Sequence, residues 1–97
     1  MKINVRFYGV FRSAAGSGFI QLDITSQEPT VRSVLAELLS REHYRNLSHL
    51  VLDGEESDPR PSALILVSGS EIGALDGLET KLKEGDELSL LPIAHGG

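Results

Sequence analysis

The chain closes with the sequence LSLLPIAHGG at residues 88–97, and the fold and function predicted below both depend on it. The first part of this stretch is aliphatic, as expected of a strand, and Pro92 ends the strand because proline has no backbone N–H to donate. The last two residues are glycines, which lack a Cβ and therefore fit a channel too narrow for any other dipeptide. The stretch predicts a strand followed by a tail that presents the carboxylate of Gly97.

The composition indicates one small acidic domain. A chain of 97 residues suffices for a single hydrophobic core. Nine basic and fourteen acidic side chains give a net charge of −5, the wrong sign for direct binding to nucleic acid. The first residues alternate between apolar and polar, and no stretch reaches membrane-spanning length, so we expect neither a signal peptide nor a membrane partner. We therefore expect a cytoplasmic location.

Hydrophobic periodicity predicts two strands and then a helix in the first half of the chain. Apolar and polar residues alternate over residues 3–8 and again over 20–25, as in half-buried strands. The small residues at 14–18 favour a turn, which would join the two strands as a hairpin. From the predicted N-cap Thr30 onward, apolar residues recur at helical spacing, namely Val31, Val34, Leu35, Leu38 and Leu39.

The second half of the chain is less regular. Residues 42–63 favour a short helical turn and an edge strand ending at Asp53-Gly54, followed by an exposed, proline-broken loop. The aliphatic run at residues 64–67 is typical of a strand covered on both faces, and residues 84–86 form a turn before the closing strand. The element order predicts an α+β domain with a mixed sheet of four to five strands packed on one main helix.

With this order and a Gly-Gly end, the chain resembles the ubiquitin-like sulfur carriers and small modifiers. These comprise the small subunit of molybdopterin synthase, the thiamine sulfur carrier, the ubiquitin-related modifier of tRNA thiolation and the small archaeal modifier proteins. The similar blocks are residues 7–16, the helix at 29–39, residues 65–69, residues 82–88, Leu91-Pro92 and Gly96-Gly97. The resemblance implies a β-grasp domain at residues 1–93 and a flexible tail at 94–97. His95 matches the His-Gly-Gly end of the tRNA-thiolation modifier, whereas molybdopterin-synthase subunits usually carry a small residue there.

The resemblance also implies a chemistry for the tail. A carboxylate is a poor electrophile, and the family solves this by adenylating the terminal glycine, here Gly97. The chain has no phosphate-binding Gly-x-x-x-x-Gly-Lys loop and no cysteine, so ATP and sulfur must be handled by partners. We expect no bound cofactor and no enzyme activity of its own. The expected partners are a ubiquitin-activating-type adenylating enzyme, which uses the ATP, and a sulfur donor protein.

Three alternatives to a free sulfur carrier remain open at this point. The chain would be a protein modifier if Gly97 were joined to lysines of target proteins. It would be a small subunit of molybdopterin synthase if it formed a stable complex with a larger catalytic subunit. It would be a binding-only domain if the tail were dispensable. The sulfur acceptor, a tRNA uridine, a pterin precursor or a thiazole, is equally open.

Several further residues are candidates for recognition. Strand alternation places Tyr8, Leu91, Ile93 and also Ile65 in an exposed apolar patch beside the tail, which would bind the partner; alternatively, Tyr8 and Leu91 only cap the sheet edge. Within the tail, His95 and Gly96 would contact the enzyme's channel. The histidines at 43, 49 and 95 lack the spacing of a metal site, so no metal is expected. Lysines 2, 81 and 83 are either conjugation acceptors or ordinary solvated side chains.

Overall fold

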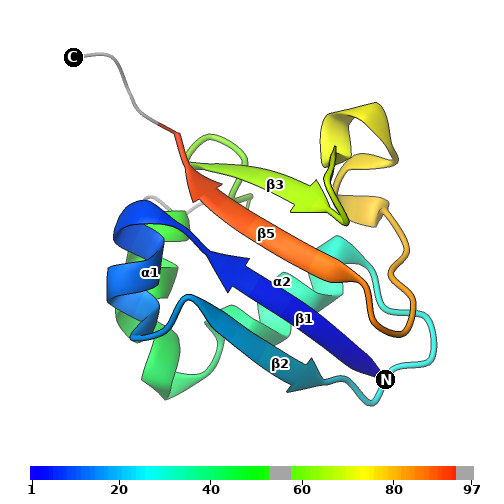
Figure 1. Cartoon of the computed structure of the whole chain (residues 1–97), viewed down its shortest axis with the longest axis horizontal. Coiled ribbons are helices and arrows are strands. Elements are labelled where there is room, and N and C mark those ends of the chain that lie inside the picture. The colour runs from blue at the N-terminus through cyan, green and yellow to red at the C-terminus, as the bar shows by residue number, and fades with distance from the viewer. Residues whose placement is uncertain (53–57, 94–97) are drawn as a thin grey trace.

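The computed structural model describes residues 1–52 and 58–93, which form a two-layer α+β domain (Figure 1). The strands are β1 (Lys2–Phe7), β2 (Phe19–Asp23), β3 (Ala63–Val67), β4 (Ser70–Glu71) and β5 (Glu87–Pro92). The helices are α1 (Gly9–Ala15), α2 (Val31–Leu39) and α3 (Arg45–Val51), with single 3₁₀ turns at η1 (Glu42–Tyr44), η2 (Ile72–Ala74) and η3 (Gly77–Glu79). The predicted fold class is confirmed.

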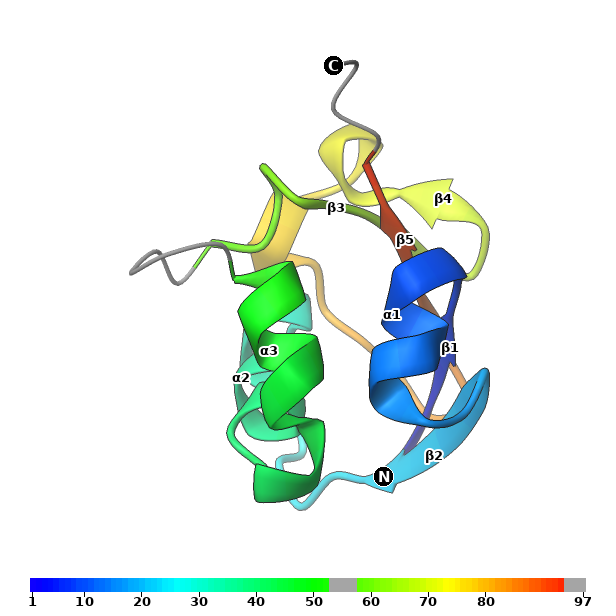
Figure 2. The same ribbon diagram turned by 90° about the vertical axis from the view of Figure 1, so that its left-hand side faces the viewer.

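The sheet has the order β2-β1-β5-β3-β4, so the last strand lies at its centre. β5 runs parallel to β1 and antiparallel to β3, while β1–β2 and β3–β4 are antiparallel pairs. A parallel pair needs a long crossover, and here the whole segment between β1 and β5 supplies it. The helices cover one face of the sheet, called the inner face below (Figure 2). Among residues 1–52 and 58–93, no helix covers the other face, called the outer face.

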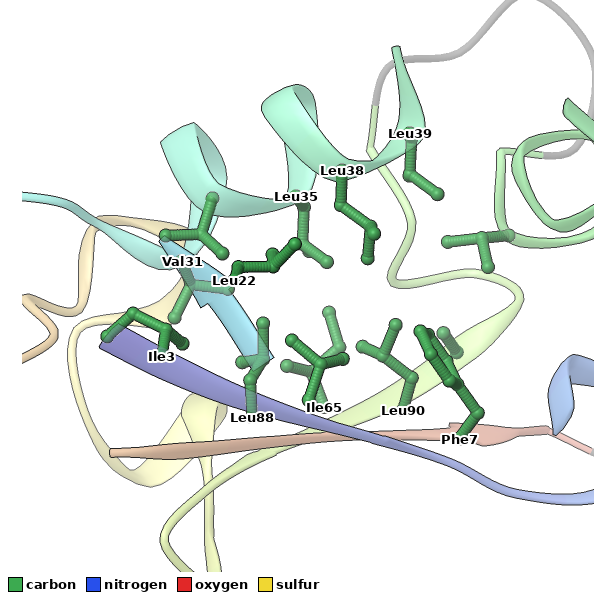
Figure 3. Close-up of a cluster of buried hydrophobic side chains, with 14 of the residues drawn as sticks. Ile3, Phe7, Leu22, Val31, Leu35, Leu38, Leu39, Ile65, Leu88 and Leu90 are labelled. Carbon is green, nitrogen blue, oxygen red and sulfur yellow. The ribbon is translucent and has the colours of Figure 1, made fainter. Parts of the chain in front are cut away.

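The core lies between the inner face and α2 (Figure 3). The predicted helical stripe of α2 is buried throughout and points at the strands. The helix begins where the sequence predicted: Thr30 Oγ1 accepts a hydrogen bond from the Ser33 N–H at 3.1 Å, and Ser33 Oγ accepts one from the Thr30 N–H at 2.9 Å. This reciprocal capping box satisfies two N–H groups that the first helical turn leaves without partners.

The hairpin predicted between the first two strands is wrong in its connection. β1 and β2 do pair, but α1 lies between them in the chain instead of a simple turn. Phe11 and Ala15, one helical turn apart, are buried in the core and hold α1 on the inner face. The helix ends at Ala15 and is capped by Gly16, whose φ of 77° lies in the left-handed region that favours glycine.

The predictions for residues 42–67 also need correction. Residues 45–51 form the helix α3, buried through Leu47 and Val51, and residues 42–52 contain no strand. The predicted strand end at Asp53-Gly54 lies outside the described residues. β3 is not covered on both faces, because Leu64 points outward and is 38% exposed. A continuous aliphatic run thus marks a strand with one core face and one apolar outer face.

Two carboxylates, those of Asp86 and Asp58, are hydrogen-bonded to loop residues. The buried carboxylate of Asp86 accepts hydrogen bonds from Ser68 Oγ (3.2 Å) and from the Lys83 N–H (2.9 Å), and so ties together the turns before β4 and β5. Where the described chain resumes, Asp58 accepts hydrogen bonds from Arg60 Nε at 2.9 and 3.0 Å. These side-chain hydrogen bonds hold the pKa of Asp58 below its usual value.

Candidate functional site

The described part of the chain ends at Ile93, directly after β5. The strand is hydrogen-bonded to a neighbour on each side, and the Ile93 N–H still donates to the Ser62 carbonyl oxygen at 3.1 Å. Gly97 is only the fourth residue after Ile93. The predicted tail, with its recognition residues His95 and Gly96 and the reactive Gly97, lies outside the described residues. What the structure gives is a firmly held base for it.

Strand register brings an apolar row together on the outer face next to this base. Leu91 pairs across from Leu64 on β3, and β1 continues past Phe7 so that Tyr8 follows on the other side of β5. The Tyr8 N–H donates to the Leu90 carbonyl oxygen at 3.2 Å, which extends the ladder by one residue. Tyr8 is 43% exposed and Leu91 is half-buried. The predicted outward direction of both side chains is confirmed.

Further apolar residues enlarge this row. We define the outer-face patch as Tyr8, Phe19, Leu64, Leu66 and Leu91. Three of these were not predicted. Phe19 is out of phase with the buried Leu22, a signal that was available in the sequence, whereas Leu64 and Leu66 lie in an aliphatic run that carries no alternation. An uncovered apolar face of this kind is typical of a protein interaction site.

Two of the predicted patch residues lie elsewhere. Ile65 is 1% exposed and points at α2 in Figure 3, so its predicted surface position is wrong. The physical reason is the register: Ile65 is paired with Leu90, and both side chains face the core. Ile93 is 40% exposed, as predicted, but it lines a separate pocket of about 270 Å³ with Val10 of α1 and Leu50 of α3.

The outer face also carries charge. Arg6 of β1 forms an ion pair with Glu87 of β5, with 2.9 Å between Nε and Oε1. Its guanidinium carbon lies 5.0 Å from the centroid of the Phe19 ring, within the range of a cation–π contact. Arg6 and Phe19 line a second pocket of about 400 Å³, which also includes Tyr8 and Arg12. The apolar patch is therefore bordered by arginines on the β2 side.

The remaining candidates are not brought together. The ring of His43 makes an edge-to-face contact with Tyr44, with 4.8 Å between centroids, and His49 lies on α3. Within residues 1–52 and 58–93, no three histidine or acidic side chains are placed to share a metal ion. The three lysines at 2, 81 and 83 are exposed and lie apart from the outer-face patch. Over the same part of the chain, no helix is long and apolar enough to cross a membrane.

In this fold a helix packs on a mixed sheet, and the last strand lies at the centre of the sheet, parallel to the first. This arrangement defines a ubiquitin-like β-grasp protein. The chain belongs to the ThiS family, whose model matches residues 5–97. It is similar to small archaeal modifier protein 3 of Haloferax volcanii, with 33% identity over 97 residues and full coverage of both chains. It is also similar to a putative sulfur carrier protein of Archaeoglobus fulgidus, with 36% identity over 77 residues, 78% of this chain and 83% of the relative.

The fold similarity extends to solved structures. The solution structure of small archaeal modifier protein 1 from Methanosarcina acetivorans superimposes with a TM-score of 0.80 at 32% identity, covering 99% of this chain and 96% of that one. Named relatives of this protein are therefore small sulfur carriers or modifiers. The resemblance stated from the sequence is confirmed at the level of the family.

Proposed function

We propose that this protein is a sulfur carrier whose Gly97 carboxylate is adenylated by a ubiquitin-activating-type enzyme and then converted to a thiocarboxylate. The observation that carries the proposal is the placement of β5. The central strand of the sheet ends at Pro92, five residues before Gly97 and beside the outer-face patch, so an enzyme bound to the patch has the tail within reach. Membership of a family with a named sulfur carrier supports the same reading.

The chemistry follows from the properties of a carboxylate. An oxygen of Gly97 attacks the α-phosphorus of ATP, pyrophosphate leaves, and the glycine becomes an acyl adenylate with AMP as its leaving group. The terminal sulfur of a persulfide on the donor protein then attacks the carbonyl carbon, and AMP departs. A thiol attacks the inner sulfur of the resulting acyl disulfide, which breaks the S–S bond and releases the thiocarboxylate. Because this chain has no cysteine, both the persulfide and the thiol belong to partners.

The chain's own contribution is docking and presentation. The apolar side chains of Tyr8 and Leu91 provide contact area on a rigid sheet, and burying them against the enzyme favours association. Gly96 and Gly97 would pass through a narrow channel to the nucleotide, with His95 in contact with its wall. The thiocarboxylate then supplies sulfur for tRNA thiolation or for molybdopterin synthesis. The protein acts as a carrier, not as an enzyme, and works in the cytoplasm.

Adenylation is tested with the cognate activating enzyme, ATP and labelled pyrophosphate. We expect exchange of label into ATP with the full chain and none after deletion of Gly97, while the deletion leaves the melting temperature unchanged. After addition of the sulfur donor, the intact mass should rise by the difference between sulfur and oxygen. Exchange that persists without Gly97 would contradict the proposal.

A second candidate is a protein modifier joined through Gly97 to target lysines, favoured by the 33% identity to a named modifier. Both functions use the same activated glycine, so they are separated by product. No lysine or arginine follows Lys83, so trypsin would leave a long remnant, residues 84–97, on each target. Ala94→Arg introduces a cleavage site, and a His-Gly-Gly remnant on lysines of other proteins would then reveal conjugation. A stable complex with a larger subunit would instead indicate a molybdopterin synthase subunit.

A further inference from the structure

The pocket at the β2 side of the outer face is unlike the rest of this acidic protein. It measures about 400 Å³ and is lined by Arg6, Tyr8, Arg12, Ser17, Gly18 and Phe19. No carboxylate of the described residues lines it, although the whole chain carries fourteen acidic side chains against nine basic ones. Tyr8 and Phe19 also belong to the outer-face patch, so the pocket and the patch form one continuous surface.

The two arginines of the pocket differ in whether an acidic side chain of the protein lies beside them. Arg6 is paired with Glu87, and its charge is offset within the protein. Arg12, in the last turn of α1, has no acidic group within 4.0 Å among residues 1–52 and 58–93. It is therefore the guanidinium in this pocket that remains available to an outside anion.

Arg12 also has a close neighbour across the turn after α1, Gly18. A Cβ added at Gly18 would lie 3.0 Å from Arg12 Nε and 3.2 Å from its guanidinium carbon, so the arginine rests directly against the glycine main chain. That main chain is itself fixed, because the Gly18 carbonyl oxygen accepts a hydrogen bond from the Phe7 N–H at 3.0 Å. Because Gly18 has no side chain, the guanidinium can approach this edge of the sheet closely.

We propose that this pocket receives an aspartate or glutamate side chain of the activating enzyme, and that Arg12 is a specificity-determining contact of the docking surface. This inference rests on the proposed function. A planar guanidinium matches a carboxylate, with which it forms two parallel hydrogen bonds. A nucleic acid fits less well, because tight binding uses roughly 6–10 phosphate contacts whereas the pocket offers one unpaired cation in a protein of net charge −5.

The first test compares binding of the activating enzyme to the parent and to Arg12→Glu at low and high salt. We expect about tenfold weaker binding at low ionic strength, mainly through slower association, because a rim charge acts on encounter and orientation. At high salt the difference should shrink, since the interaction is screened. The matched control is Arg45→Glu on α3, which changes the net charge equally on the helix-covered side, at a side chain 70% exposed; it should bind like the parent.

The second test identifies the chemical group that meets the pocket. Arg12→Lys places a primary amine there, and a zero-length carbodiimide then couples that amine to any carboxylate in contact. We expect a cross-linked peptide that joins position 12 to an aspartate or glutamate of the activating enzyme, found by mass spectrometry. The parent, with arginine at this position, should give no such peptide.

The outcomes separate this inference from the proposed function. Adenylation of the parent, together with unchanged binding of Arg12→Glu and no cross-link at position 12, would overturn the pocket assignment and leave the carrier function standing. Absence of any binding or exchange with the parent would overturn both. Arg12→Gln, which keeps a polar side chain and removes only the charge, should bind between the parent and Arg12→Glu; if only the glutamate variant is impaired and it also melts early, the inference fails.

Discussion

Leu90 and Leu91 are neighbours on β5 that face opposite sides of the sheet, and replacing each with aspartate tests both the fold and the docking surface. Leu90 is fully buried on the inner face, whereas Leu91 is half-buried on the outer face across from Leu64. The two variants introduce the same charge one residue apart. Only the side of the sheet differs, so any difference in their behaviour reports the strand phase.

The expected magnitudes differ widely. Truncating a buried leucine costs about 2–5 kcal/mol, and burying an unpaired carboxylate adds several more, against a total stability of about 5–15 kcal/mol for a domain of this kind. Leu90→Asp should therefore unfold the protein or nearly so. Leu91→Asp loses only part of the roughly 1.5–3 kcal/mol of a fully buried leucine, including its cross-strand contact, so we expect a cost of about 1 kcal/mol.

Two assays check the pair. In thermal unfolding, about 1 kcal/mol corresponds to a fall of roughly 4–8 °C in the melting temperature for a domain of this size. In a binding assay with the activating enzyme, Leu91→Asp should weaken docking by ~1–3 kcal/mol, as loss of an apolar anchor does. If Leu91→Asp melts as early as Leu90→Asp, the strand phase is wrong. If it melts late and still binds like the parent, the outer-face patch is not the docking surface.

Three further predictions concern the scaffold and are read by unfolding experiments. Thr30→Ala removes half of the capping box with Ser33 and should cost about 1 kcal/mol; an unchanged melting temperature would show that the cap is dispensable. Asp86→Ala leaves two donors from neighbouring turns without their acceptor and should cost about 1–3 kcal/mol, whereas a smaller loss would mean that water replaces the carboxylate. Because the pKa of Asp58 is lowered in the fold, its pairing with Arg60 stabilises the protein fully above the unfolded-state pKa, and this stabilisation is lost as the pH falls through the folded-state pKa. Asp58→Asn should therefore be slightly less stable than the parent at neutral pH and equally stable in acid. A difference in stability that does not change with pH would contradict the pairing.

The parts of the fold that the sequence predicted are those with a regular period. The helix α2 carries an uninterrupted apolar stripe and a threonine cap, and both are local signals. In β5, the alternating residues Leu88 and Leu90 predict which side chains face the core, and both are buried. Pro92 predicts where the strand ends, and it is the last residue of β5. The direction of Leu91 was predictable for the same reason.

The errors arose where the deciding contact is distant in the sequence. α1 buries Phe11 and Ala15 and packs the half-buried Ala14 against the core, and these residues do not make a readable helical period. The phase of Ile65 is set by its pairing with Leu90, which an aliphatic run cannot reveal. The pocket at Arg12 depends on an approach to Gly18 across a turn, which no local pattern encodes.

The short distance between Ile93 and Gly97 constrains how any partner can use this protein. Four extended residues span at most about 14 Å, so the surface that binds the domain and the site that acts on Gly97 must lie within that distance of each other on the partner. A connection of this length leaves little freedom to correct a misoriented domain. An apolar patch alone gives affinity with little directional preference, because the hydrophobic effect is non-directional. A charge contact at the edge of the patch supplies the direction, which is why Arg12, although distant from Gly97 in the chain, bears on the reaction at the tail.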